Sequence, residues 1–145
     1  MDDLEALLNE VRLLWHRMVQ VSEKLHETEP ISLGMRGVLE RLLLGGPLAV
    51  PQMARQRGVT RQHIQALVNG LHRRGLVRLA TNPAHKRSAL VFLSPAGERV
   101  IRRMRAREAR VLARARLGLR AAEIRGATAT LRAVRGRLGG DRDAA

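Results

Sequence analysis

Apolar residues recur at a helical spacing near both ends of the chain. In residues 3–27 they stand about 3.5 positions apart, the spacing of a narrow seam between associating helices. The same spacing returns in residues 121–138. The first seam consists of Leu4, Leu8, Val11, Trp15, Met18 and Leu25, and the second of Ile124, Ala127, Leu131, Val134 and Leu138. Both segments are therefore predicted to be amphipathic helices that pack against other helices.

Shorter helices are predicted between these ends from their start and stop residues. Ser32 can cap a helix that ends on Gly45-Gly46. Pro51 suits the first turn of the next helix, which closes at Gly58. Thr60 can cap a further helix that continues to about residue 74 and stops at the following glycine.

The apolar pattern then changes from that of a helix to that of β-strands. Residues 76–81 and 89–94 are rich in β-branched and apolar side chains and flank a polar loop, which predicts a hairpin with a basic tip. Ser94 and Pro95 begin another helix, which Gly118 bends or ends. The predicted fold class is mainly α with a small β-hairpin (α+β).

The order of two short helices, a tight turn and a basic-tipped hairpin is that of a winged helix-turn-helix. Ala54 is small where the two helices must approach closely, and Gly58 stands at the turn. The predicted parts of the chain are an N-terminal dimerisation helix (1–30), a winged helix-turn-helix domain (31–98), C-terminal dimerisation helices (99–138) and a flexible tail (139–145).

The charge of the chain indicates what kind of partner it binds. The formal net charge of the chain is +14, although residues 1–30 hold seven acidic and only three basic side chains. A folded and strongly basic body favours a polyanionic partner, with nucleic acid ahead of an anionic membrane. The acidic first helix can face the arginine-rich stretch from Arg99 to Arg120, which can equally be a solvated face or a phosphate-binding surface.

The helix capped by Thr60 carries the candidate DNA-binding residues. Its outer face has no acidic side chain, which favours approach to phosphates. Side chains near its start can reach base edges in a major groove, and those further along suit phosphates. The predicted base-reading residues are Arg61, Gln62, His63 and Gln65, and the predicted phosphate-binding residues are Asn69, Arg73 and Arg74. At the hairpin tip, Arg87 is predicted to enter a minor groove and Lys86 to bind phosphate.

The stretch from Leu48 to Glu98 resembles the MarR family of bacterial winged helix-turn-helix transcriptional regulators. The ordered positions that carry the resemblance are Met53-Ala54, Gly58-Val59-Thr60, Leu67-Val68, Leu71, Gly75-Leu76-Val77, Arg87, Leu93-Ser94 and Gly97. Two positions depart from the family's pattern. His85 replaces an acidic residue that helps to hold the wing arginine in the family, and Ala49 stands where a hydroxyl cap is usual.

The resemblance implies a homodimer in which helices from both ends of the chain interlock and two winged domains meet successive major grooves. Many relatives of this kind release DNA when a small phenolic or carboxylate ligand binds between the dimer helices and the winged domain. A ligand pocket of this kind would be lined by Trp15, Met18, Val19, Met35 and Leu39. Ordinary core packing among the helices is the alternative interpretation of these five residues.

Enzymatic chemistry is not indicated. The chain has no cysteine, its histidines lack the i, i+4 pairing of a metal site, and no phosphate-binding loop or nucleophile turn is present. We therefore expect no cofactor and no metal, and a cytoplasmic, nucleoid-associated protein. The predicted function is a dimeric, sequence-specific transcriptional regulator, a ligand-responsive repressor of a pseudo-palindromic operator. The alternative is a winged-helix nucleoid or RNA-associated protein without sequence specificity.

Overall fold

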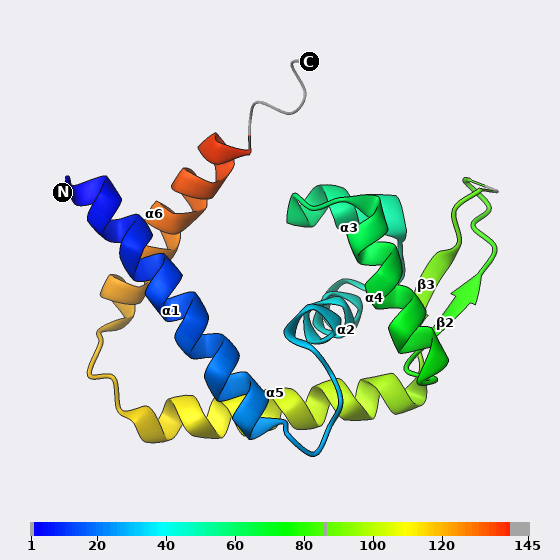
Figure 1. Cartoon of the computed structure of the whole chain (residues 1–145), viewed down its shortest axis with the longest axis horizontal. Coiled ribbons are helices and arrows are strands. Elements are labelled where there is room, and N and C mark those ends of the chain that lie inside the picture. The colour runs from blue at the N-terminus through cyan, green and yellow to red at the C-terminus, as the bar shows by residue number, and fades with distance from the viewer. Residues whose placement is uncertain (1, 86, 140–145) are drawn as a thin grey trace. The chain divides into compact units, whose positions relative to one another are not determined.

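A computed structural model describes residues 2–85 and 87–139 of the chain (Figure 1). Lys86 and residues 140–145, most of the predicted tail, lie outside the described residues. In chain order the elements are α1 (Asp3–Leu25), α2 (Leu33–Gly45), β1 (Leu48–Ala49), α3 (Val50–Arg57), α4 (Arg61–Arg73), β2 (Val77–Ala80), β3 (Leu90–Leu93), α5 (Pro95–Ala115) and α6 (Ala121–Leu138). The predicted class, mainly helical with a small antiparallel sheet, is confirmed.

The sheet has one strand more than the predicted hairpin. Its order is β1-β3-β2, with Leu48 opposite Val91 and Ala49 opposite Leu90. A strand of two residues is too short to show an alternating pattern, and β1 runs directly into α3, so the sequence suggested only the helix. The extra strand fixes the start of α3 to the base of the hairpin.

Local capping residues place most helix ends where the sequence predicts them. Ser32 Oγ accepts from the Met35 N–H, and Asp2 forms a reciprocal capping box with Glu5 at the start of α1. The end of α5 differs from the prediction. Arg116 has a left-handed φ of 45°, so the helix ends at Ala115, before the glycine expected to end it.

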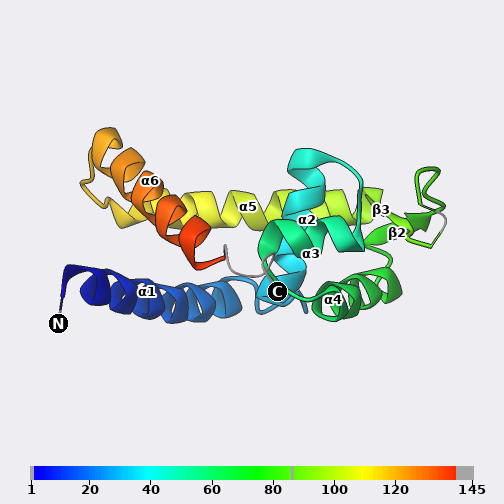
Figure 2. The same cartoon turned by 90° about the horizontal axis from the view of Figure 1, so that it is seen from above.

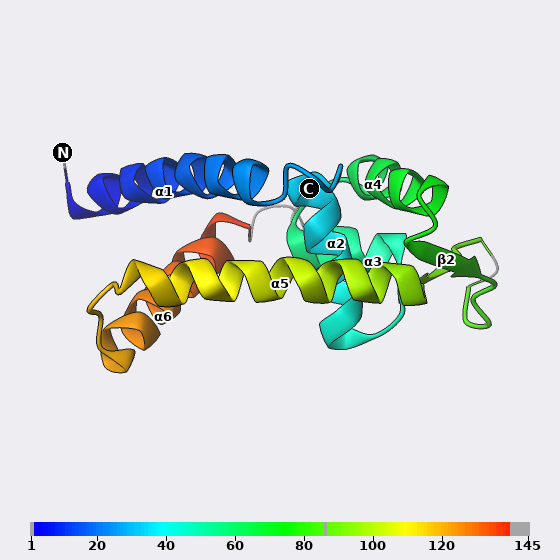
Figure 3. The same cartoon turned by 90° about the horizontal axis from the view of Figure 1, so that it is seen from below.

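The chain divides into two compact units, residues 1–110 and 111–145. The core of the first unit lies among α2, α3, α4, the sheet and the first half of α5, which Figure 3 shows as a continuous helix. Its members are Val38, Leu39, Leu42, Met53, Ala54, Ile64, Val68, Leu71, Leu76, Val77, Val91 and Ile101. By contrast, α1 and α6 contain no buried residue, although both carry an apolar seam. Among the described residues, no helix has the length and hydropathy needed to cross a bilayer.

A tight corner joins the hairpin to α4 and α5. The Ser94 hydroxyl donates to the Gly75 carbonyl (2.7 Å) and accepts from the Gly97 N–H (3.0 Å), while the Ser94 N–H donates to the Leu76 carbonyl. A Cβ on Gly97 would lie 2.0 Å from the Leu76 carbonyl oxygen. Only glycine therefore lets the start of α5 pack this closely against the chain that enters β2.

We expect Gly97→Ala to lower the free energy of unfolding by about 1–3 kcal/mol, because the added methyl group meets backbone that cannot yield easily. The matched control is Gly136→Ala in α6, where a Cβ meets nothing within 4 Å. That change should be neutral or stabilising by up to about 1 kcal/mol. Urea unfolding of both variants measures the difference, and equal stabilities would contradict the proposed close approach.

Candidate nucleic-acid interface

The turn between α3 and α4 sets the direction of α4. Gly58 adopts a left-handed φ of 66°, and the Val59 N–H donates to the Ala54 carbonyl at 3.1 Å. Thr60 Oγ1 then accepts from the His63 N–H at 3.1 Å, which caps the first turn of α4. Ala54 is buried beneath the turn, as its small size predicted. The turn thus fixes both the start and the entry angle of α4.

The two faces of α4 are sharply different. Ile64, Val68 and Leu71 are fully buried in the core. The residues predicted to contact DNA are all exposed on the other side: Arg61, Gln62, His63, Gln65, Asn69, Arg73 and Arg74. Because an α-helix repeats every 3.6 residues, burial of one stripe holds the polar stripe outward.

A groove runs between the start of α4 and the hairpin. In Figure 1 the β2–β3 hairpin runs back alongside α4, toward the amino-terminal end of that helix. The groove has a volume of about 360 Å³, and Arg61, Gln62 and Gln65 line one side of it. Arg87 and the neighbouring Ser88 line it from the hairpin. The structure therefore brings three predicted base-reading residues and the predicted wing arginine to one concave surface.

The hairpin tip is organised by a residue that the sequence analysis did not single out. Asn82 is nearly buried, its Oδ1 accepts from the Ala84 N–H (3.0 Å), and its carbonyl accepts from the His85 N–H (3.2 Å). The first bond forms an Asx turn and the second closes a β-turn, and Asn before proline is a usual signal for a turn. Figure 2 shows the hairpin projecting beyond α4. Among the described residues of this loop, where His85 stands in place of the family's acidic residue, Asn82 supplies the side-chain hydrogen bond that shapes the turn.

The hydroxyl cap that is missing at Ala49, the second departure from the family pattern, is also replaced by a nearby residue. Ala49 has no side chain to cap α3, and its own N–H donates to Gln52 Oε1 at 3.1 Å. This is the reciprocal half of a capping box. The pairing of Ala49 with Leu90 in the sheet holds the same residue from the other side. The start of α3 is therefore fixed without a hydroxyl group.

The predicted DNA-binding residues further along α4 differ in whether their side chains already bind other residues. Gln65 Nε2 donates to Asn69 Oδ1 at 2.8 Å, which links a residue predicted to read bases to one predicted to bind phosphate. Arg73 is exposed, whereas the Arg74 guanidinium turns back to the Gly70 carbonyl (3.2 Å) and the Met35 sulfur (3.8 Å). Arg74 must leave these partners to reach a phosphate.

The five residues predicted to line a ligand pocket do not share one environment. Trp15 and Met18 are 53% and 50% exposed on α1, and Leu39 is fully buried in the core. Met35 packs against the core, close to Gly70 of α4. Val19 lines a cavity at the turn between α1 and α2, and none of the other four lines that cavity.

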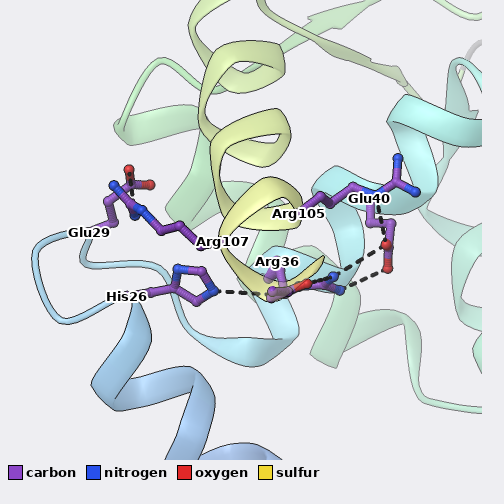
Figure 4. A network of polar contacts seen from close by, with 7 residues as sticks. His26, Glu29, Arg36, Glu40, Arg105 and Arg107 are labelled. Atoms are coloured by element: carbon purple, nitrogen blue, oxygen red, sulfur yellow. Dashed lines mark hydrogen bonds and ion pairs between the residues drawn. The ribbon is translucent and has the colours of Figure 1, made fainter. Parts of the chain in front are cut away.

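A polar network joins the α1–α2 turn, α2 and α5 (Figure 4). Glu108 of α5 is its centre, since it accepts from Arg36 Nε (2.6 Å) and lies 3.1 Å from the Nε2 of the buried His26. Arg36 also donates to Glu40 at 2.8 Å. Glu29 Oε1 pairs with two arginines of α5, Arg103 (3.1 Å) and Arg107 (3.4 Å). Glu29 lies in the turn after α1, so these pairs come from the turn and not from the acidic first helix that was expected to face this stretch.

The charges of this network are mutually stabilised. Burial raises the pKa of the Glu108 carboxyl, but the hydrogen bonds from Arg36 and His26 outweigh burial and hold that pKa below its ordinary value. The same hydrogen bond to Glu108, assisted by Glu40, raises the pKa of the Arg36 guanidinium. Both groups are therefore charged at neutral pH, and they tie α2 to α5 beneath the winged domain. No sequence pattern marked them, because they are 72 positions apart.

Comparisons with known proteins agree with this geometry. A model of the MarR family matches residues 37–88, the segment from α2 to the hairpin tip. A protein of Mycobacterium tuberculosis with no characterised function is 48% identical over 54 residues. That match covers 37% of this chain and only 38% of the length of the mycobacterial protein.

Solved structures match over most of the chain. A MarR family transcription regulator has a TM-score of 0.77 at 29% identity, with 97% of this chain and 92% of that chain covered. The PcaV transcriptional regulator of Streptomyces coelicolor, solved in complex with its natural ligand, has a TM-score of 0.69 at 28% identity. The coverage there is 85% of this chain and 89% of that chain.

We expect Glu108→Gln to lower the free energy of unfolding by about 1–3 kcal/mol at neutral pH, because Arg36 loses a charged partner. The lowered pKa of folded Glu108 means that its stabilising effect is present above the ordinary carboxyl pKa and is lost as the pH falls through the lowered value. The difference from wild type should therefore shrink in acid, as measured by urea unfolding at two pH values.

The matched control for this prediction is Glu98→Gln on the same helix. Glu98 pairs with Arg102 at the surface, so its loss should cost less than about 0.5 kcal/mol at either pH. A Glu108→Gln deficit that stays constant down to pH values below the carboxyl pKa would show that the ion pair is not its cause.

Proposed function

We propose that this chain, which belongs to the MarR family of bacterial winged helix-turn-helix transcriptional regulators, represses transcription by binding a pseudo-palindromic DNA operator as a homodimer. Proteins of this family and fold are regulators and not enzymes. The observation that carries the proposal is the groove in which Arg61, Gln62 and Gln65 of α4 face Arg87 of the hairpin.

In this proposal α4 enters the major groove with its amino-terminal end foremost. A major groove about 12 Å wide admits one helix. Arginine pairs bidentately with guanine and glutamine with adenine, so Arg61, Gln62 and Gln65, together with His63, are assigned to base edges. Asn69 and Arg73 lie further along the exposed face and are assigned to phosphates, as is Arg74 once it leaves Gly70.

The hairpin would supply the second contact with the duplex. Arg87 is exposed next to the groove, where it can follow the DNA backbone into the adjacent minor groove. Lys86, which precedes Arg87 in the sequence and lies outside the described residues, is assigned to phosphate. The bonds of Asn82 within the loop reduce the conformational entropy that the tip loses on binding.

A homodimer is supported by the apolar surface of α1. Leu4, Trp15 and Met18 of its seam are each about half exposed, and nothing in α1 is buried. An exposed apolar stripe along a helix of 23 residues favours an interface over a free surface. The seam of α6, with Ile124 and Leu131 also exposed, is assigned to the same interface.

A ligand response is proposed by analogy with PcaV, whose structure contains its natural ligand. Trp15, Met18 and Val19 lie on α1, and Met35 lies on α2, so a ligand along α1 could contact the seam and the winged domain together, whereas the fully buried Leu39 would support the site from within the core. Such a ligand could change the spacing of two winged domains. The protein would then act in the cytoplasm on nucleoid DNA.

A specific operator is favoured over uniform binding to nucleic acid. The net charge of +14 supports either function, because phosphate contacts carry no sequence information. The start of α4 favours specificity, since Gln62 and Gln65 are uncharged, exposed and placed beside the groove. Neutral amides add little to phosphate attraction and suit base edges.

Substitution of two arginines of α4 tests the assignment of its first residues to bases and its later residues to phosphates. Arg61→Ala should cost about 1–3 kcal/mol of operator binding and relax the preference at one base pair. Arg73→Ala should weaken binding to operator and random DNA alike and reduce the salt slope by about 1. Fluorescence anisotropy at several salt concentrations measures both. A uniform loss from Arg61→Ala would place Arg61 on phosphate and count against base reading.

A substitution in the apolar seam of α1 tests whether the protein forms a dimer through this helix. Trp15→Glu places a charge in the exposed seam and should convert the dimer to a monomer in sedimentation velocity at micromolar concentration. Gln20→Glu, at an exposed position outside the seam, is the control and should leave the dimer intact. If the Trp15→Glu protein sediments as a dimer, the seam of α1 is not the interface.

A further inference from the structure

A cavity of about 330 Å³ lies at the turn between α1 and α2. The last turns of α1, the connecting loop and the first residues of α2 line it. Val19, Ile31 and Leu33 supply an apolar wall. This volume is within the range of pockets that hold small molecules. It shares no lining residue with the groove between α4 and the hairpin, and Val19 is the one residue of the proposed ligand response that lines it.

The charge of this cavity is opposite to that of the chain. The described residues that line it include three carboxylates, Glu23, Glu27 and Glu29, and no lysine or arginine. In a protein of net charge +14, an acidic cavity next to an apolar wall favours a positively charged guest. Arg103 and Arg107 approach Glu29 from α5, but they pair with Oε1 only.

Two buried polar atoms of the cavity lining have no hydrogen-bond partner. They are Nδ1 of His26 and Oε2 of Glu29. His26 is only 3% exposed, and its Nε2 lies 3.1 Å from the Glu108 carboxylate. In the neutral imidazole, donation from Nε2 to Glu108 leaves Nδ1 as an acceptor. In Figure 4 this second ring nitrogen is turned to the side on which Glu29 stands. Buried acceptors without donors are costly, so they point to a missing donor.

We propose that the cavity at the α1–α2 turn binds a small organic cation of the amine or amidine class. Its N–H groups donate to His26 Nδ1 and Glu29 Oε2, and its apolar body lies against Val19 and Ile31. A carboxylate guest would meet the like charges of Glu23, Glu27 and Glu29, and could accept only from the hydroxyls of Ser22 and Ser32 among the lining side chains whose donors are certain. The proposal deepens the proposed function, because it names the charge class of an effector, and it rests on that function for any effect on DNA.

The cavity is connected to the DNA-reading helix through α2. His26 contacts Glu108, which holds Arg36 of α2. The neighbouring Met35 reaches Gly70 of α4, where its Cε lies 2.5 Å from the position of a Cβ. A cation that fixes the His26 ring therefore acts on an element that touches α4.

The test uses probes of matched shape and opposite charge on the full-length protein. Benzamidine and phenethylamine are the cations, and benzoate and phenylacetate are the anions. Isothermal titration should give each cation an affinity at least about tenfold higher than that of its anionic counterpart, a difference of about 1.4 kcal/mol. Long-range ¹H–¹⁵N spectra of the histidines should show benzamidine shifting Nδ1 of His26.

Two variants locate the binding. Glu29→Gln keeps an Oε1 acceptor for Arg103 and Arg107 but removes the charge, and should weaken benzamidine binding at least about fivefold. Val19→Trp fills the cavity from α1 and should abolish benzamidine binding. Glu98→Gln, a carboxylate on α5 outside the cavity, is the control and should bind benzamidine as the wild type does.

Equal affinity for anions and cations, no binding of either cation, or cation binding that survives both variants would each overturn the proposal. DNA binding of the same preparation is measured in parallel without a ligand. If operator binding is intact and no cation binds, the proposed cation site fails and the DNA-binding function stands. If cations bind and no DNA is bound, the cation site stands and the proposed DNA-binding function fails.

Discussion

The burial of one stripe of α4 is the constraint on which the remaining structure depends. Ile64, Val68 and Leu71 have no exposed surface, and together with α2, α3 and the sheet they form the core of the winged domain. Full burial of three such side chains contributes several kcal/mol, of the order of 1.5–3 kcal/mol each. Rotation of α4 about its axis would lose this packing, so the helix cannot turn Arg61 and Gln65 away from solvent.

The hairpin is placed by the same core. Val77 and Val91 are buried members of it, so β2 and β3 are fixed to the helices from which α4 projects. The corner at Ser94 then sets the distance between the hairpin and the start of α5. The groove between α4 and Arg87 is therefore a consequence of packing, and its polar residues need no mutual contacts to be held in place.

Local signals predicted most of this fold, and long-range contacts account for what they missed. Thr60, Ser32 and the positive φ of Gly58 act within a few residues, so the helices and the turn could be predicted. The short strand β1 exists only because β3 lies beside it. The exposed residues of α4 and Arg87 followed from helix period and hairpin order, and the structure places Arg61, Gln62, Gln65 and Arg87 around one groove.

The buried and partly buried polar residues of the network around Glu108 and of the hairpin tip could not be found from local sequence signals. His26 and Glu108 are 82 positions apart and meet only in the folded chain. Asn82 was visible as a turn residue, but its bonds to Ala84 and His85 became clear only with the loop in place. Conversely, the five residues grouped as a pocket lie in exposed, buried and intermediate positions, because helical spacing alone does not distinguish a seam from a core.

We propose that the exposed start of α4 selects DNA by sequence and not by charge alone. The most direct measurement is selection of bound fragments from the native genome by the purified full-length protein at physiological salt, followed by affinity measurement on the enriched and random duplexes. We expect one pseudo-palindromic motif with half-sites about one helical turn apart, bound about 10³-fold or more tightly than random DNA. Equal affinity for all duplexes would contradict it.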